Sequence, residues 1–162
     1  LAVFNLDEIS YNSVLHAMTK ESDPKWLAVA EDILQEMKEK NIPISQITYH
    51  VMMNIYAKSS DDDGANRAEL LLRGMEEEGL AASDISYNIC IDAFARRGDC
   101  RKAESLLVEM MSLSNHGKVE WQPSIHSFAS VVRIFVPFRV PAQRKILFSN
   151  LPMTISTNRS ML

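Results

Sequence analysis

Apolar side chains recur along residues 9–135 with the spacing of amphipathic helices. One set begins at a tyrosine, Tyr11, and continues at the third, fourth and seventh residues after it; equivalent sets begin at Tyr49 and Tyr87. A second set begins at an alanine and ends at a methionine, over residues 30–37, 68–75 and 103–110. Because an α-helix has about 3.6 residues per turn, each set occupies one face of a helix. The chain is therefore predicted to form pairs of amphipathic helices.

The two helical sets return at a nearly constant interval. The quartet ISYN occupies residues 9–12 and 85–88, and ITYH lies between them at 47–50, while Phe128 in IHSF takes the place of the tyrosine in a fourth unit. The shortest distances between successive helices indicate a basic unit of about 35 residues, a length typical of helical-hairpin repeats. Turn formers such as ESDP, SSDDDG and RRGD separate the helices of each unit. A single hairpin cannot bury its apolar face, so neighbours must stack, which predicts an all-α fold, an α-solenoid of antiparallel helical hairpins.

The repeats divide the chain into segments. Residues 1–8 are expected to be the end of a preceding repeat, and prolines at 137 and 141 interrupt the pattern near its other end. Residues 136–162 are expected to form an irregular basic tail, in which 142–149 are compatible with a short helix. We therefore expect a fragment of a longer array. The expected array is 9–135, divided into repeats 9–45, 47–83 and 85–124 and a partial repeat 125–135.

Charge is distributed unevenly along the chain. All 21 acidic residues lie within 1–120 with 12 of the 17 basic ones, so this part has a net charge of −9, whereas 121–162 has +5. No stretch approaches the roughly 18 consecutive apolar residues of a membrane span, so no membrane partner is expected. The two cysteines, Cys90 and Cys100, have neither metal-ligand nor redox-pair spacing. We expect both to be reduced thiols in or near the core.

Residues typical of catalysis are not grouped in this sequence. It contains no His, Cys, Asp or Glu cluster with ligand spacing, no Gly-rich phosphate loop and no nucleophile beside a base. The stretch DDDG at 61–64 is interpreted as a solvated turn whose acids favour the next helix N-terminus, rather than as a metal site. We therefore expect no catalytic residue, metal, cofactor or small-molecule substrate.

A helical hairpin of this length that opens with I-[ST]-Y-[NH] and closes with A-E-x-[IL]-L-x-x-M resembles the pentatricopeptide repeat family. Residues 85–110 match it best, and the resemblance covers roughly residues 3–135. The tetratricopeptide repeat has a period of about 34 residues and a Trp-Leu-Gly-Tyr pattern that is missing here. The resemblance implies a right-handed superhelix that binds single-stranded RNA, about one nucleotide per repeat, along a groove lined by the first helices.

The resemblance also implies a setting. Members of this family are expected in a mitochondrion or chloroplast, where they act in RNA processing, stability or translation. The chain begins with Leu and shows no basic amphipathic leader, so the expected compartment rests on the resemblance alone.

The same resemblance assigns residues that contact bases. The residue after each tyrosine would touch a base edge together with the last residue of the repeat, and the residue two before the tyrosine would pack on the base face. Asn with Ser resembles the family pair that prefers cytosine, with uracil second, so the expected ligand contains C-x-C. In the fourth unit His126 and Ala129 take these places, and Ala129 cannot read a base edge. The implied base-edge pairs are Asn12 with Ser45, His50 with Ser83 and Asn88 with Ser124, and the implied packing residues are Ile9, Ile47 and Ile85.

Each assignment has a structural alternative. Asn or His near a helix start can hydrogen-bond free backbone groups, the isoleucines can form core between repeats, and the serines can cap helices. For the whole chain the alternative is a scaffold that binds other proteins with no direct RNA contact. The acidity of residues 1–120 favours it, because Lys and Arg supply much of the affinity for nucleic acid. Other proteins bound through flanking repeats are compatible with either function.

Overall fold

The computed structural model describes residues 7–20, 24–117 and 119–135. These residues form helices joined by short turns, and no described residue lies in a strand. Most of the expected preceding-repeat segment (1–6), the basic tail 136–162 and the short helix at 142–149 lie outside the described residues. The helices are α1 (Glu8–Met18), α2 (Pro24–Glu39), α3 (Gln46–Lys58), α4 (Gly64–Glu77), α5 (Asp84–Arg96), α6 (Cys100–Asn115) and α7 (Ile125–Phe135).

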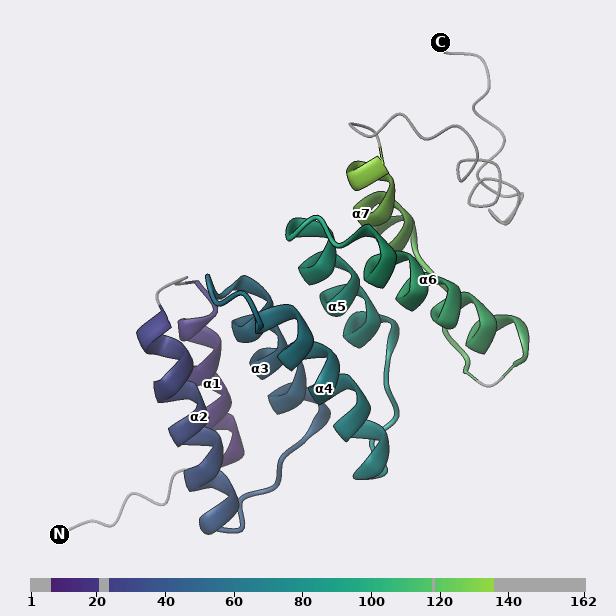
Figure 1. The fold of residues 1–162 in the computed structure, drawn as a ribbon. Coiled ribbons are helices and arrows are strands. Elements are labelled where there is room, and N and C mark those ends of the chain that lie inside the picture. The colour runs from purple at the N-terminus through teal and green to yellow at the C-terminus, as the bar shows by residue number, and fades with distance from the viewer. Residues whose placement is uncertain (1–6, 21–23, 118, 136–162) are drawn as a thin grey trace, which may run out of the picture.

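The helices are paired into hairpins that stack side by side (Figure 1). Helices α1, α3, α5 and α7 are the first helices of successive repeats, and each packs against the next. The second helices α2, α4 and α6 each pack against their own first helix and the following one. No two second helices come within 8 Å, Cα to Cα, in the described residues. Successive first helices thus lie closer together than successive second helices do. This difference curves the array, so that the first helices line its inner side.

The N-cap of each of the first helices α1, α3 and α5 is the residue four positions before its tyrosine. Asp7 is the N-cap of α1 and its carboxylate accepts a hydrogen bond from the backbone N–H of Ser10 at 2.9 Å. Ser83 caps α5 through a capping box with Ser86. Second helices end where the backbone turns left-handed, at Asn41 (φ 55°) and Gly79 (φ 75°). These local signals set the length of each hairpin.

The repeat signature forms the core. The alanines that open the second-helix sets, Ala30, Ala68 and Ala103, are completely buried, which permits the close helix approach that a larger side chain would prevent. Around them lie fully buried aliphatic and sulfur-containing side chains that fill the seams between hairpins. These are Leu15, Met37, Met52, Met53, Leu72, Met75, Cys90, Ile91, Leu107 and Met110.

The recurring tyrosine closes each hairpin with a polar contact as well as with burial. Tyr11 donates its phenol hydrogen to Glu36 Oε1 at 2.9 Å, and Tyr87 donates to Glu109 Oε1 at 2.8 Å. Both acceptors stand six residues after the alanine of the second helix, where repeat two has Gly74 instead. Burial, together with the carboxylates of Glu78 and Glu77, raises the pKa of Tyr49 to about 12. The recurring tyrosine therefore has two roles: its ring packs in the core, and in repeats one and three its hydroxyl links the first helix to the second.

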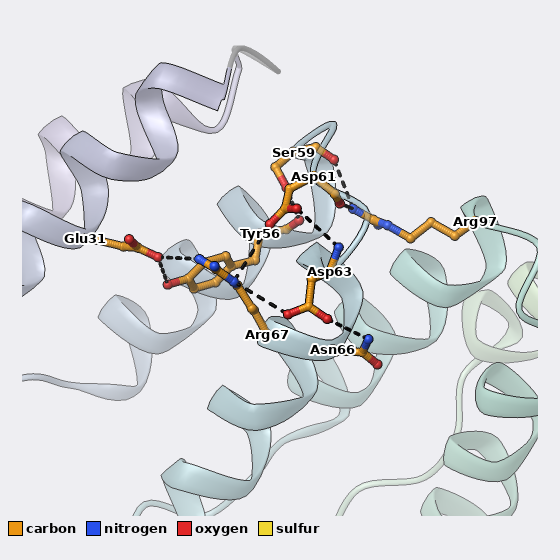
Figure 2. A network of polar contacts seen from close by, with 8 residues as sticks. All are labelled: Glu31, Tyr56, Ser59, Asp61, Asp63, Asn66, Arg67 and Arg97. Carbon is orange, nitrogen blue, oxygen red and sulfur yellow. Dashed lines mark hydrogen bonds and ion pairs between the residues drawn. The ribbon is translucent and has the colours of Figure 1, made fainter.

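Long charged side chains bridge the second helices. Arg73 on α4 donates two hydrogen bonds to the carboxylate of Glu109 on α6, at 2.5 and 2.7 Å. Arg67 Nη1 reaches Glu31 Oε1 on α2 at 2.8 Å, and Tyr56 donates to the same carboxylate oxygen (Figure 2). Such contacts span the wider outer layer, where the backbones of the second helices lie more than 8 Å apart.

The DDDG stretch forms a turn that leads into α4. Asp61 and Asp63 each lie 3.8 Å from Arg67, and Asp63 also accepts from the Asn66 amide at 2.8 Å (Figure 2). The interpretation as a turn is confirmed, with Asp63 as the N-cap residue of α4. Across this turn lies Arg97, whose guanidinium donates to the carbonyls of Ser59 and Asp61 at 3.0 Å.

Helix length and cysteine chemistry agree with the sequence pattern. None of the helices in the described residues is long and apolar enough to cross a bilayer. Both cysteines are free thiols, Cys90 buried and Cys100 partly exposed at the start of α6. The expectation of thiols in or near the core is confirmed.

Candidate nucleic-acid interface

Three equivalent isoleucines lie exposed along the first helices. Ile9, Ile47 and Ile85 have 74%, 62% and 53% of their surface accessible, although each belongs to the first turn of a helix that buries its tyrosine and other apolar residues in the core. The alternative that they form core between the repeats is therefore wrong. A large apolar side chain that is exposed at the same position in each of the three full repeats forms a regular apolar row on the inner layer.

The three candidate edge-reading residues lie one turn further along the same helices. Asn12, His50 and Asn88 are half-buried, three residues after the isoleucines, so each pair shares a helix face. Their hydrogen bonds go to side chains, and none caps a free backbone group among the described residues. The arrangement places an apolar surface and a polar group side by side in each repeat.

Two of these side chains contact a hydroxyl of the following repeat, and the third does not. His50 Nε2 lies 2.8 Å from Ser86 Oγ, and Asn88 Oδ1 accepts from Ser127 Oγ at 2.6 Å. At the first junction Thr48 holds the equivalent place, but its hydroxyl and the Oδ1 atom of Asn12 are both buried without a hydrogen-bond partner.

The closing serines begin the next first helix. Ser83 caps α5 and also lies 3.2 Å from His50 Nε2, so the structure brings this predicted pair together. Ser45 occupies the N-cap of α3 without a side-chain capping bond, and its buried hydroxyl has no partner. Ser124 directly precedes α7, and its backbone N–H donates to Ser127 Oγ at 3.1 Å. Neither Ser45 nor Ser124 bonds directly to its predicted asparagine.

The first and fourth repeats differ from the third in detail. In repeat one the Asn12 amide nitrogen donates to Glu8 Oε1 at 3.2 Å. In the fourth unit His126 and Ala129 are both exposed at the start of α7. Ala129 offers only a methyl group, so this unit lacks a polar group at the position of Asn88.

His50 is the one titratable side chain among the three. Burial lowers its pKa below the ordinary value of 6.5, and the carboxylate of Asp84 opposes this shift. The imidazole is therefore neutral near neutral pH, with Nε2 facing the hydroxyls of Ser83 and Ser86.

Sequence reasoning missed a basic residue that recurs with the same period. Lys20, Lys58 and Arg96 each stand nine residues after the tyrosine of their repeat, and all three are exposed at the ends of first helices. Each follows its repeat's isoleucine by eleven residues. For Lys58 and Arg96 this is about three turns within one helix, so each lies on the same side of the helix as its isoleucine, whereas Lys20 lies in the turn just after α1. The signal was present in the sequence as a third periodic position.

The described residues contain no group of three His, Cys, Asp or Glu side chains arranged to hold a metal ion. The inner layer thus offers three kinds of group in each of the three full repeats: an apolar surface, a short polar side chain and a cation. All three types repeat at equivalent positions, and this periodicity is the main feature of the candidate interface.

Comparison with protein-family models gives two matches. A PPR repeat family model matches residues 6–58, and a PPR repeat model matches residues 85–119, so that together they span more than half of the chain. The chain belongs to the pentatricopeptide repeat (PPR) family. A search of curated proteins found no match.

Solved PPR structures have the same fold. PPR10 in complex with an 18-nucleotide psaJ RNA element superimposes with a TM-score of 0.73 at 20% identity, covering 98% of this chain and 21% of PPR10. The PPR domain of Arabidopsis thaliana protein-only RNase P 1 in complex with tRNA gives a TM-score of 0.73 at 18% identity, covering 94% and 75%. At these identities the likeness establishes the superhelical PPR fold alone. The chain spans about a fifth of the length of PPR10.

Proposed function

We propose that the inner layer of this PPR array binds single-stranded RNA selectively, about one nucleotide per repeat, with a preference for pyrimidines in a C-x-C pattern. The observation that carries the proposal is the exposed row of Ile9, Ile47 and Ile85, each beside a half-buried Asn or His. An exposed row of large apolar side chains needs a partner with apolar faces, and unpaired bases provide them. PPR10 and the RNase P PPR domain were both solved with RNA, which supports the proposal.

The chemistry of each repeat suits a single nucleotide. The isoleucine covers one face of the base, the adjacent Asn or His hydrogen-bonds its edge, and the basic residue at the end of the helix contacts a phosphate. An amide or imidazole reads an edge that a duplex would hide, so the ligand must be unpaired. Ser45, Ser83 and Ser124 contribute by fixing where the next helix begins and, for Ser83, by contacting His50 directly.

The biological setting follows from the family. PPR proteins are commonly organellar, so we place this chain in a mitochondrion or chloroplast, in the processing, stability or translation of a transcript. Further repeats outside this chain would extend the recognised sequence, because linked modules gain affinity together.

A protein-binding scaffold is the second candidate. The net charge of −9 over residues 1–120 supports it, as do Leu70 and Val108, which are exposed on the second helices. These features lie largely on the outer layer, whereas the inner layer carries the periodic cations Lys20, Lys58 and Arg96. The two functions therefore use different faces, and the choice of variant can separate them.

Binding of the whole chain to C-rich, U-rich, A-rich and G-rich single-stranded RNAs at two salt concentrations tests the proposal. We expect pyrimidine-biased binding that weakens as salt rises. The triple variant Ile9→Ser, Ile47→Ser, Ile85→Ser should lower affinity about tenfold or more while keeping its helical content, because fully burying an isoleucine side chain is worth about 1.5–3 kcal/mol. Leu70→Ser with Val108→Ser on the outer layer is the matched control. Equal affinity for RNA in the isoleucine triple variant would refute an inner-layer site.

A further inference from the structure

Repeats one and three carry the same reading pair in different surroundings. Each has Asn followed at the end of the repeat by Ser. In repeat three the amide oxygen of Asn88 is held by the Ser127 hydroxyl at 2.6 Å. In repeat one the amide oxygen of Asn12 has no partner, and the amide nitrogen is held by Glu8. Residue identity alone therefore does not describe what the two amides offer to a ligand.

The contact at Asn88 fixes the orientation of the amide. Ser127 is 1% exposed, and its Oγ atom accepts the backbone N–H of Ser124 at 3.1 Å while donating to Asn88 Oδ1. A separation of 2.6 Å is typical of an O–H···O bond and is shorter than an N–H···O bond usually is. The oxygen thus faces repeat four, and the Nδ2 hydrogens have no acceptor among the described residues. The side chain therefore turns its oxygen toward Ser127 and leaves its donors for a ligand.

A donor-only amide discriminates between the two pyrimidines. Cytosine carries adjacent acceptors, N3 and O2, whereas uracil has an N3–H donor between its two carbonyl oxygens. A freely rotating amide can satisfy either edge, because it both donates and accepts. An amide whose oxygen is turned toward Ser127 can donate to N3 and O2 of cytosine, but it leaves the uracil N3–H without an acceptor, which costs binding energy.

We propose that Ser127 is a specificity-determining positioning residue: by holding the Asn88 amide oxygen, it makes repeat three select cytosine over uracil. This inference rests on the proposed RNA binding. The base choice of one repeat is therefore set partly by the next. It follows that repeat one, where no hydroxyl holds the Asn12 oxygen and only the nitrogen is bonded, to Glu8, discriminates less between cytosine and uracil although its reading pair is the same.

The test uses the whole chain and short RNAs in which each of three successive nucleotides is in turn cytosine or uracil. Wild type should prefer cytosine by about fivefold at the nucleotide bound by repeat three, and by less than about twofold at the one bound by repeat one. Ser127→Ala should reduce the first ratio to less than about twofold while pyrimidines remain preferred to purines. Any loss of folded protein lowers affinity for both RNAs equally, so the ratio isolates the positioning effect.

Thr48→Ala is the matched control, because it removes the equivalent hydroxyl at a junction where that hydroxyl bonds to nothing. It should leave every cytosine-to-uracil ratio unchanged. An unchanged ratio at repeat three in folded Ser127→Ala overturns the inference, while the absence of any RNA binding by wild type overturns the proposed function instead.

Thr48→Ser tests the same inference if Ser127→Ala does not fold. The branched Thr48 side chain is restricted about χ1, and Thr48→Ser frees the hydroxyl to reach the unpartnered Oδ1 atom of Asn12. We expect the ratio at repeat one to rise by about threefold. A ratio that stays at its wild-type value counts against Ser127 and its equivalents as positioning residues.

Discussion

Gly64 begins α4 in a space too small for a side chain. A Cβ atom there would lie 2.3 Å from the carbonyl oxygen of Tyr56, 2.6 Å from Ser59 Oγ and 2.7 Å from a guanidinium nitrogen of Arg97. The carbonyl belongs to the backbone of α3 and cannot turn aside. The second hairpin therefore closes tightly only because this residue is glycine.

Gly64→Ala should accordingly destabilise the chain by about 2–3 kcal/mol, as overpacking of a closely packed site does. Gly74→Ala is the control, since a Cβ at this helical position meets nothing within 4 Å. There the substitution should stabilise by about 0.5–1 kcal/mol through helix propensity. Urea unfolding followed by circular dichroism measures both changes. Similar effects of the same sign would contradict the packing described at Gly64.

His50 makes stability depend on pH in a direction fixed by its environment. Its pKa is depressed in the folded chain, mainly by burial, so the unfolded chain binds this proton more readily. The contribution of the neutral imidazole is complete above the unfolded value of 6.5 and is lost as pH falls below it. The contact with Ser83 and Ser86 thus weakens in mild acid.

His50→Asn, which places the residue of repeats one and three in repeat two, should remove this pH dependence. We expect the difference in Tm between about pH 7.5 and about pH 5.5 to be larger for wild type than for the variant. His116→Asn, at an exposed position after α6, is the control and should behave as wild type. Equal pH profiles for His50→Asn and wild type would indicate that burial does not shift the imidazole.

The positions of the candidate interface were predictable from sequence, but their partners were not. A helical period places Ile85 and Asn88 on one face whatever the neighbouring repeat does. The hydroxyls that meet His50 and Asn88 come from 36 and 39 residues away, so they depend on how two hairpins stack. Nothing local distinguishes Ser127, which bonds, from Thr48, which does not.

At the scale of the helix, sequence and structure agree closely. Each predicted apolar set lies within one helix, because a helical face is defined by residues only three or four apart. The additional residues between Tyr49 and Ala68 fall in the turn between α3 and α4, as expected of an insertion in a stacked array. The link from tyrosine to glutamate within each hairpin was not predicted, because Glu36 and Glu109 lie 25 and 22 residues after their donors.

Arg97 connects neighbouring hairpins through backbone carbonyls. It stands at the C-cap of α5 and donates to Ala57, Ser59 and Asp61 around the end of α3, at 3.0 Å in each case. Carbonyls at a helix C-terminus lack partners within the helix and carry partial negative charge, so a guanidinium is well suited to them. One side chain thus anchors both the turn and the stacking of repeat three on repeat two.

Arg97→Ala should cost about 2–3 kcal/mol, because it leaves these carbonyls without their charged donor. Arg101→Ala, an exposed arginine on α6, should change the free energy of unfolding by less than about 0.5 kcal/mol. Chemical denaturation of the two variants side by side measures the difference. A cost at Arg97 no greater than that at Arg101 would show that the carbonyl contacts do not support the stack.

At the scale of the whole molecule, shape and charge work together. Neighbouring first helices contact one another and neighbouring second helices do not, so the layer of first helices faces the inside of the curve. The acids that make residues 1–120 negative are concentrated in turns and second helices. There Glu31 and Glu69 form ion pairs with a basic residue of the next repeat, and Glu109 with Arg73 of the preceding one. Net charge therefore does not describe the inner layer, where the end of each first helix of a full repeat carries one basic residue, of which Arg96 also pairs with Asp92 on the same helix.

If these basic residues contact phosphates, RNA affinity should fall with salt in proportion to their number. Three contacts to a single strand predict a slope of log affinity against log salt of about −2. The triple variant Lys20→Gln, Lys58→Gln, Arg96→Gln should flatten this slope to about −0.5. The control, Lys38→Gln with Arg101→Gln on the second helices, should leave the slope unchanged. Filter binding across a salt series gives both values. A slope that survives the triple variant would place the phosphate contacts elsewhere.

The two cysteines differ in a way that has a practical use. Cys90 is fully buried, and its pKa is raised to about 12, chiefly by that burial, whereas Cys100 is partly exposed at the start of α6. The thiolate is the nucleophile that adds to a maleimide, so a fluorophore will attach at Cys100 and leave Cys90 unmodified. The native chain thus provides a single labelling point on its outer layer, from which fluorescence anisotropy can follow a ligand without a dye in the groove.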